Sequence, residues 1–315
     1  MNFQRESILD RARGALVATA VADALGAGYE FQPPLPDSEP VVFKANTFEL
    51  GEYTDDTAMM LAIAKAAKKG NLITQLDFVA EEFFEWVESS PKDIGIQTRH
   101  VFGNAKGKLA ADLIQAATEY LDSHEKAAGN GSLMRTAAVA LPFLSTPDSV
   151  GIAADQISSL THMDLDCREA CVIWSKAIRH AILFENFDGI QLAINDLPAF
   201  RQNYWNEILD QAESASSPTE FANNGWVIHA IQAAYSAIRL TQTEHPGHLV
   251  AGIEAAVRVG NDTDTVAAIA GGLLGARWGY SAIPANWLKP IHGWPGLKTK
   301  DLVALADEIT EPIWL

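Results

Sequence analysis

The stretch of sequence that decides the fold lies at residues 260–276 and reads GNDTDTVAAIAGGLLGA. From residue 266 onward it is rich in Ala, Gly and aliphatic side chains, which predicts a helix packed closely at the centre of the molecule. The apolar run is too short to cross a bilayer and ends at Arg277. Gly271 and Gly275 are four residues apart, so we expect another helix to approach this one closely. The alternative is that the two glycines merely lower helix propensity.

Apolar residues at helical spacing recur along most of the chain. The segments that show it are residues 8–20, 58–67, 78–87, 110–121, 172–183 and 227–240. Breaks rich in Pro and Ser are spread between them and mark no single domain boundary. The alternation typical of strands is nearly absent, with only a hint at residues 41–43. The sequence therefore predicts one all-α domain over residues 1–315, built from many short helices.

Composition excludes several classes of protein. The chain has 315 residues, 48% hydrophobic and 20% charged, as in an ordinary globular protein. Its 23 basic and 40 acidic residues give a net charge of −17, which disfavours binding to nucleic acid. The N-terminal residues lack the apolar core of a signal peptide, so we expect a cytoplasmic protein without a membrane partner. Cys167 and Cys171 are expected to be buried thiols within a helix over residues 167–181.

Two acidic clusters stand directly before predicted helices. They are residues 52–57 (EYTDDT) and residues 260–265 (GNDTDT). One interpretation is helix capping, because Thr, Asp and Asn are preferred N-caps and acids suit the helix dipole. A cap needs one such side chain, however, and each cluster holds several. The repeated pattern therefore favours metal binding.

The residue types in these clusters narrow the choice of metal. Carboxylates and hydroxyls are hard oxygen donors, suited to magnesium, manganese or calcium rather than zinc. Asp262 and Asp264 fit the opening of a calcium-binding EF-hand loop, but the required glycine and distant glutamate do not follow. If the two clusters meet in space, four carboxylates face one another. A pair of divalent cations would offset their repulsion and would form a hydrolytic site.

A third feature is the glycine-rich segment at residues 129–135 (GNGSLMR), which leads into a segment at 136–144 that reads as helix. Glycines let successive backbone N–H groups turn toward an anion, and a helix N-terminus adds partial positive charge. The segment suits a phosphate or diphosphate. Such turns are also common before helices without any ligand, so the motif is informative mainly beside a metal site.

In this order, these motifs resemble those of the ADP-ribosylglycohydrolases. The resemblance rests on residues 22–26 (ADALG), Glu30-Phe31, residues 53–57 (YTDDT), residues 129–135, Thr161-His162 and residues 260–272. It extends from about residue 10 to about residue 280. Residues 90–95 (SPKDIG) also resemble the arginine-directed bacterial branch of the family. The resemblance implies an orthogonal bundle of helices with two Mg²⁺ or Mn²⁺ ions at its centre, and removal of ADP-ribose from a modified side chain.

The resemblance also implies roles for individual residues. The expected metal ligands are Thr54, Asp55, Asp56, Asp262, Asp264 and Thr265. The expected catalytic residues are Glu30, Asp55, Asp56 and Asp264. The expected substrate-binding residues are Asp93, Gly129, Asn130, Gly131, Ser132, Leu133, Met134, His162 and Trp226. Among these, the loop at 129–134 would hold the diphosphate, His162 would lie near the ADP-ribose, and Trp226 would stack on a ring. Arg135 either serves this site or pairs with an internal carboxylate.

The hypothesis for the reaction follows from this arrangement. The two cations would grip the ribose hydroxyls and a water, and Glu30 or one of the aspartates would take the proton as water attacks. The partners are an ADP-ribosylated protein as substrate and ADP-ribose as product. Arginine is the favoured acceptor, with Asp93 as an outer contact for its guanidinium. Serine-linked or O-acetyl-linked ADP-ribose, a two-metal phosphohydrolase, and a non-catalytic crystallin-like protein are the alternatives.

Overall fold

The structure, a computed structural model, describes residues 2–311, and its regular secondary structure is almost all helix. Its helices are α1 (Asn2–Gly26), α2 (Asp55–Lys69), α3 (Asp77–Glu88), α4 (Ile96–Asn104), α5 (Ala110–Ser123), α6 (Pro147–Ser159), α7 (Leu165–Phe184), α8 (Gly189–Asn195), α9 (Ala199–Ser214), α10 (Val227–Leu240), α11 (Gly247–Val257), α12 (Thr263–Trp278), α13 (Ala285–Leu288) and α14 (Thr299–Ile309). Strands β1 (His292–Gly293) and β2 (Leu297–Lys298) form a small antiparallel hairpin. The prediction of an all-α fold is confirmed.

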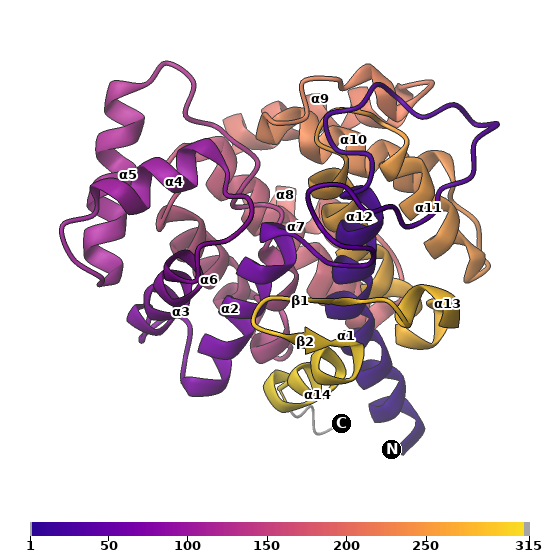
Figure 1. Cartoon of the computed structure of the whole chain (residues 1–315), viewed down its shortest axis with the longest axis horizontal. Coiled ribbons are helices and arrows are strands. Elements are labelled where there is room, and N and C mark those ends of the chain that lie inside the picture. Colours follow the sequence, from indigo (N-terminus) through magenta and orange to yellow (C-terminus); the bar gives the residue numbers. More distant parts are fainter. Residues whose placement is uncertain (1, 312–315) are drawn as a thin grey trace.

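Helices α1 and α12 lie antiparallel against each other at the centre of the molecule (Figure 1). Every residue of α12 from Thr263 to Arg277 is buried. The two backbones touch at glycines: a Cβ on Gly275 would lie 2.1 Å from the carbonyl oxygen of Gly14, and one on Gly271 would lie 2.6 Å from that of Ala18. The expected close approach to Gly271 and Gly275 is therefore confirmed, because no larger residue fits at this crossing.

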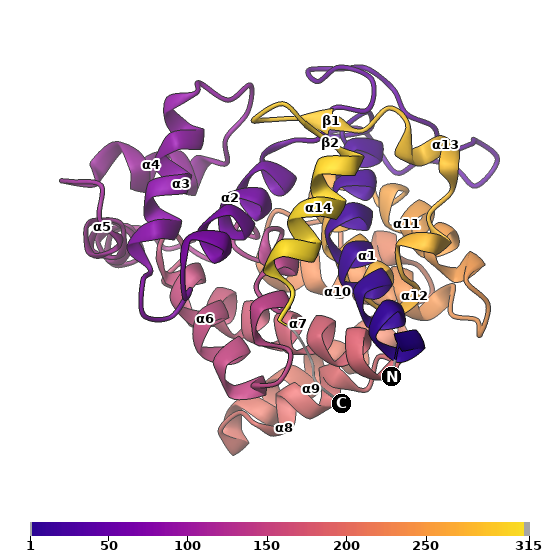
Figure 2. The same ribbon diagram turned by 90° about the horizontal axis from the view of Figure 1, so that it is seen from below.

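The other helices surround this central pair. Helices α3, α4 and α5 gather on one side of the molecule, and α9, α10 and α11 on the other (Figure 1). Helix α14 lies along α1 and also contacts α2 (Figure 2). Helix α7 packs on α12, where the indole Nε1 of Trp174 donates a hydrogen bond to the carbonyl of Ile269 (2.9 Å). This bond joins α7 to the middle of α12.

Two local expectations differ from the structure. Residues 41–43 form no strand, because the Tyr29 hydroxyl accepts from the N–H of Val42 (2.9 Å) and donates to its carbonyl (3.0 Å). Residues 136–144 form two 3-10 turns, Thr136–Ala138 and Leu141–Phe143, instead of a helix. Pro142 within the second turn has no backbone N–H to donate to an α-helical ladder.

The two cysteines lie on α7, as predicted, and both are buried and free. Their thiols face the glycine-rich segment: Sγ of Cys167 lies 3.2 Å from the carbonyl oxygen of Gly129, and Sγ of Cys171 lies 3.4 Å from Oγ of Ser132. Among the helices that the structure describes, none combines the length and apolar character needed to span a membrane.

Candidate functional site

The two acidic clusters meet in space at the starts of α2 and α12. Carboxylate oxygens of Asp23, Asp56 and Asp264 lie within 4.8 Å of one another. Oxygens of Glu30, Asp262 and Asp264 form a second group with the same spacing. Asp264 belongs to both groups, so the two sets of oxygens share one buried side chain. The central expectation from the sequence, that the clusters come together, is confirmed.

The turn after α1 brings Glu30 to this place. Two backbone hydrogen bonds join it to the loop before α12: Phe31 N–H donates to the carbonyl of Asn261 (2.7 Å), and Asn261 N–H donates to that of Gln32 (2.9 Å). Phe31 and Asn261 both adopt left-handed backbone conformations, with φ of 58° and 57°. Gly26 makes the crossing possible, because a Cβ there would lie 2.5 Å from Cα of Asp264.

Asp23 is a site residue that the sequence reasoning did not assign. Its carboxylate is fully buried and accepts hydrogen bonds from the N–H of Thr54 (3.0 and 3.1 Å), and from the N–H (3.0 Å) and hydroxyl (2.5 Å) of Thr57. Burial raises the pKa of Asp23 to about 6. The sequence feature that could have identified Asp23 is its position as the one charged residue in the apolar run ALVATAVADALGA at residues 15–27.

Helix capping accounts for only one residue of the two clusters. Thr54 is the N-cap of α2, and its side chain accepts from the N–H of Asp56 (3.4 Å). Asp262 occupies the N-cap position of α12 but makes no capping hydrogen bond with its side chain. Oδ1 of Asp56 is buried and has no hydrogen-bond partner among residues 2–311. An orphaned carboxylate oxygen at this depth is expensive, so it favours a cation as its missing partner.

The acids of the cluster hold protons more firmly than ordinary carboxylates. Burial, followed by the charges of Asp262 and Asp93, raises the pKa of Glu30 to about 8. Burial, followed by the charge of Asp93, raises the pKa of Asp55 to about 7. Burial also raises the pKa values of Asp56 and Asp264 well above their usual range. These groups therefore repel one another when ionised, and Asp93 lies close enough to add to the repulsion.

The remaining predicted ligands, Asp55, Thr54 and Thr265, differ in their contacts with the acidic cluster. Asp55 adds its charge to the cluster but belongs to neither group of three oxygens. The hydroxyl of Thr54 donates to Oδ2 of Asp56 (3.0 Å), and the hydroxyl of Thr265 faces the sulfur of Met134 at 4.0 Å. Both threonines are buried at the helix starts, as the sequence pattern indicates.

The glycine-rich segment is joined to the acidic cluster through Asn130. Its side-chain Nδ2 donates to Oδ2 of Asp262 (2.7 Å) and to the carbonyl of Asn224 (2.8 Å). Oδ1 of Asn224 in turn accepts from the N–H of Asp262 (3.1 Å). Asn224 is almost fully buried and is a second organising residue that the sequence reasoning did not assign.

Within this segment the residues differ in what they offer a ligand. The side chains of Ser132, Leu133 and Met134 are buried, so they present only backbone atoms. The N–H groups of Leu133 and Met134 are already donated to the carbonyl of Asn130 (2.9 and 3.3 Å). The described part of the chain supplies no acceptor for the N–H groups of Gly131 and Ser132. These two groups are the ones available to an anion.

His162 and Trp226 both lie against the same segment. A Cβ on Gly129 would be 3.3 Å from Nε2 of His162, and one on Gly131 would be 3.1 Å from Cε1, so the imidazole packs directly against the loop. Trp226 pairs with Gly129 in an antiparallel bridge and leaves 37% of its surface exposed. The structure therefore brings the predicted loop, histidine and aromatic residue together beside the acidic cluster.

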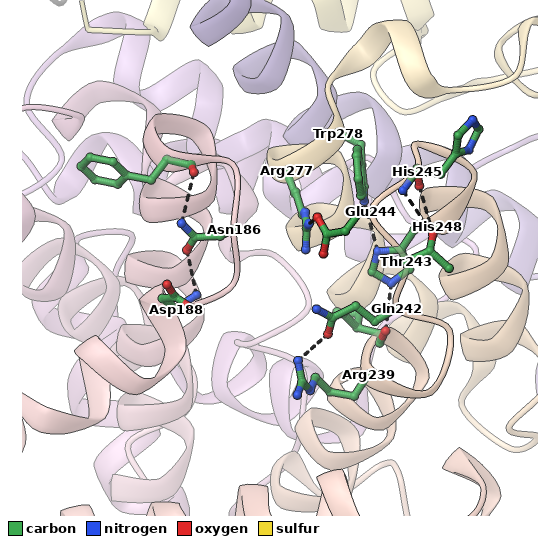
Figure 3. Close-up of polar contacts among 12 residues, drawn as sticks. Asn186, Asp188, Arg239, Gln242, Thr243, Glu244, His245, His248, Arg277 and Trp278 are labelled. Carbon is green, nitrogen blue, oxygen red and sulfur yellow. Dashed lines mark hydrogen bonds and ion pairs between the residues drawn. The ribbon is translucent and has the colours of Figure 1, made fainter.

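A cavity of about 490 Å³ lies elsewhere, between α8, α9 and α10 and the C-terminal end of α12. None of the predicted site residues lines it. Its buried Arg277 is paired with Glu244 (2.8 Å; Figure 3). The guanidinium carbon also lies over the rings of Phe187 and Trp278, 4.7 and 4.6 Å from their centroids. We interpret this arginine as part of the packing of α12.

Fold and site together define a class of protein. It is all-helical, with a buried cluster of carboxylates suited to hard divalent cations and a glycine-rich loop suited to an anion beside it. The family model for ADP-ribosylglycohydrolase matches residues 4–314, so the chain belongs to the ADP-ribosylglycohydrolase family. The match corrects the limits inferred from the motifs, because it includes the hairpin and α14 beyond residue 280.

Relatives with curated names show what this chain is similar to. It is 27% identical to the ADP-ribosyl-[dinitrogen reductase] glycohydrolase of Rhodospirillum rubrum, covering 90% of this chain and 91% of that protein. It is 25% identical to the ADP-ribosylarginine hydrolase Tri1 of Serratia proteamaculans, covering 89% and 75%. It is 22% identical to the human ADP-ribosylhydrolase ARH3, covering 91% and 90%.

A solved structure described as an ADP-ribosylglycohydrolase-related protein complex has the same fold. It superposes with a TM-score of 0.71 at 25% identity and covers 96% of this chain and 98% of the other. The family and its named relatives support hydrolysis of ADP-ribose linkages.

Proposed function

We propose that this protein removes ADP-ribose from modified protein side chains, with arginine as the preferred acceptor and two divalent cations, Mg²⁺ or Mn²⁺, as cofactors. One observation carries the proposal: Asp56 and Asp264, which belong to two separate acid–threonine sequences, lie with their carboxylate oxygens within 4.8 Å of each other in a buried cluster.

The donor set fits this kind of cation. All of the converging ligand atoms are oxygens, which suits Mg²⁺ and Mn²⁺ rather than softer metals. One group, Asp23, Asp56 and Asp264, would hold one cation, and the other, Glu30, Asp262 and Asp264, would hold the second. The orphaned Oδ1 of Asp56 supports this assignment. When bound, such cations orient sugar hydroxyls and lower the pKa of water.

The glycine-rich loop would bind the diphosphate of ADP-ribose. The free N–H groups of Gly131 and Ser132 point to an anion held by the backbone, while Asn130 ties the loop to Asp262 (2.7 Å). The partly exposed indole of Trp226 beside Gly129 offers a face for stacking on a ring of the substrate. His162, packed under the loop, completes the substrate side of the site.

The reaction breaks the bond between the anomeric carbon of the ribose and the acceptor atom. We assign Glu30 as the group that takes the proton of the attacking water, because its carboxylate lies beside Asp262 and Asp264 in the cluster where the water would be held. The surrounding carboxylates stabilise the positive charge that develops on the sugar. A guanidinium leaving group is attracted to the same negative field, with Asp93 as its outer contact.

The test is a panel of substrates with matched cation conditions. Peptides carrying arginine-linked and serine-linked ADP-ribose, together with O-acetyl-ADP-ribose, are incubated with Mg²⁺, Mn²⁺ or a chelator. We expect release of intact ADP-ribose, fastest from arginine, abolished by the chelator and by Asp55→Ala or Asp264→Ala. Cleavage of ADP-ribose at its diphosphate would indicate a phosphohydrolase instead. Absence of turnover with every substrate would favour a non-catalytic protein.

A further inference from the structure

Arg135 is a buried arginine that faces no acid. It is 0% exposed, and within the described residues no carboxylate lies within 4.0 Å of its guanidinium. The guanidinium carbon instead lies 4.6 Å from the ring centroid of Phe83. Nη2 donates to the carbonyl of Ile157 (3.1 Å) and to the hydroxyl oxygen of Thr161 (2.7 Å). Of the two alternatives for Arg135, pairing with an internal carboxylate is therefore wrong, and the contact with Thr161 needs its own explanation.

The hydroxyl of Thr161 connects Arg135 to His162. A guanidinium has donors only, so Oγ1 of Thr161 must accept from Arg135. The same oxygen lies 2.8 Å from Nδ1 of His162. The described residues offer the hydroxyl hydrogen no other acceptor, so it is donated to Nδ1. A neutral imidazole carries a single N–H, which must then be on Nε2.

The surroundings keep this imidazole neutral and fixed in place. Burial and the charge of Arg135 hold the pKa of His162 well below its usual value. The carbonyl of Thr161 accepts from Nε2 of Gln97 (3.0 Å), and the N–H of His162 donates to the carbonyl of Ser158 (2.8 Å). The backbone around His162 is thus fixed by hydrogen bonds, and its ring lies with Nε2 toward Gly129 and Gly131.

Nε2 of His162 differs from the same atom in another buried histidine. In His248, Nδ1 accepts from the indole of Trp278 (3.2 Å) and Nε2 faces the carbonyl of Ile238 (2.9 Å), so both ring nitrogens are used inside the protein (Figure 3). For His162, Thr161 satisfies Nδ1, but no described residue accepts the hydrogen of Nε2. Its donor remains available beside the loop.

We propose that Arg135 and Thr161 are positioning residues that hold His162 as the tautomer protonated on Nε2, and that this N–H donates to an anionic oxygen of the ligand at the loop 129–132. The identity of the ligand as ADP-ribose rests on the proposed function. The control of the His162 tautomer does not rest on the proposed function, since it follows from contacts within the protein alone.

The first experiment determines the tautomer in the full chain without ligand. Long-range ¹H–¹⁵N spectra distinguish a protonated from an unprotonated ring nitrogen, and His162→Gln identifies the signals by their loss. We expect Nδ1 of His162 to be unprotonated and Nε2 to be protonated. Thr161→Ser should keep this pattern, and Thr161→Val should lose it. Protonation on Nδ1 in the wild type, or an unchanged pattern in Thr161→Val, would overturn the proposal.

The second experiment measures binding of ADP-ribose by calorimetry to variants shown to be folded by their circular dichroism. We expect Thr161→Val to bind about tenfold more weakly, as for one lost hydrogen bond to a charged oxygen, and Thr161→Ser to bind normally. His162→Gln, whose amide nitrogen stands near the place of Nε2, should bind better than His162→Asn. Equal binding by Thr161→Val and wild type would refute the donor role.

The two experiments separate the inference from the proposed function. If the wild type binds no ADP-ribose, the proposed function and the ligand part of this inference fail together. The spectra of the unliganded protein still decide whether Arg135 and Thr161 set the tautomer. Arg135→Met provides a second variant for that decision, because it removes the donor and the charge and keeps an apolar side chain over Phe83.

Discussion

Asp23 and Thr57 are joined by two hydrogen bonds that fix the start of α2: the carboxylate accepts from the hydroxyl of Thr57 (2.5 Å) and from its backbone N–H (3.0 Å). Through these bonds α1 determines where Asp56 stands. The same carboxylate contributes an oxygen to the group with Asp56 and Asp264. Asp23 thus both orients a neighbouring ligand and belongs to the proposed cation site.

Replacing Asp23 should therefore impair the site more than replacing an acid at the start of another helix. In Asp23→Asn, an NH₂ group faces backbone donors, and the negative charge is lost. We expect cation affinity and turnover to fall about 10–100-fold, the usual effect of losing an orienting partner. The matched control is Asp77→Asn, because Asp77 also accepts a backbone N–H (from Ala110, 2.8 Å) but lies outside the cluster. Equal activity of Asp23→Asn and wild type would contradict this role.

The stability of the cation-free protein should fall as pH rises. The pKa values of Asp23, Asp55 and Glu30 are raised to about 6, 7 and 8. A raised carboxyl pKa means that the folded state binds more protons than the unfolded state, so its contribution is fully present below about pH 4 and is lost as pH rises through these values. Thermal unfolding in chelator, from pH 6.5 to pH 8.5, measures the effect, because above about pH 6.5 the buried His162 is neutral in both the folded and the unfolded state and adds no pH dependence of its own.

Two comparisons attribute this loss to the cluster. Saturating Mg²⁺ or Mn²⁺ should flatten the pH dependence, because cations offset the repulsion between ionised acids. Asp264→Asn should melt higher than wild type in chelator at pH 8 and gain little from added cation. A cation-free wild type whose Tm rises over this range, or an Asp264→Asn variant that melts lower, would show that the acids do not repel as described.

The crossing of α1 and α12 gives a prediction about stability alone. Gly275→Ala would place a Cβ 2.1 Å from the carbonyl oxygen of Gly14, where only backbone could move away. We expect the free energy of unfolding, measured in urea, to fall by about 1–3 kcal/mol. Gly103→Ala on α4, where a Cβ meets nothing within 4 Å, should be neutral or stabilising. Similar effects of the two changes would contradict the close approach.

Much of the fold was predictable because its signals are local. Alanine- and glycine-rich segments at helical spacing predicted the central helices, and Gly271 with Gly275 predicted their contact. The segment at 136–144 was predicted as helix from its apolar spacing alone. That prediction overlooked Pro142, which has no backbone N–H to donate in an α-helix. Residues 41–43 were ambiguous because a single distant hydroxyl, that of Tyr29, satisfies the polar groups of Val42.

The site was predictable where several polar residues stand together in the sequence. Asp55, Asp56, Asp262 and Asp264 do so, and their number exceeds what capping requires. Asp23 does not, since a single acid in an apolar helix carries no spacing pattern. The partners of Asn224 and Arg135 also depend on contacts between segments distant in the chain, such as Arg135 with Thr161 (2.7 Å). Such contacts leave no trace in local composition.

The most direct test of the central claim is the number of Mn²⁺ ions bound per chain, measured by calorimetry and by electron paramagnetic resonance. We expect two ions for the wild type, because two groups of oxygens share Asp264. Asp264→Asn should lose both, and Asp262→Asn, which alters one group, should lose one. A folded wild type that binds no Mn²⁺, or an Asp264→Asn variant that still binds two, would contradict the account.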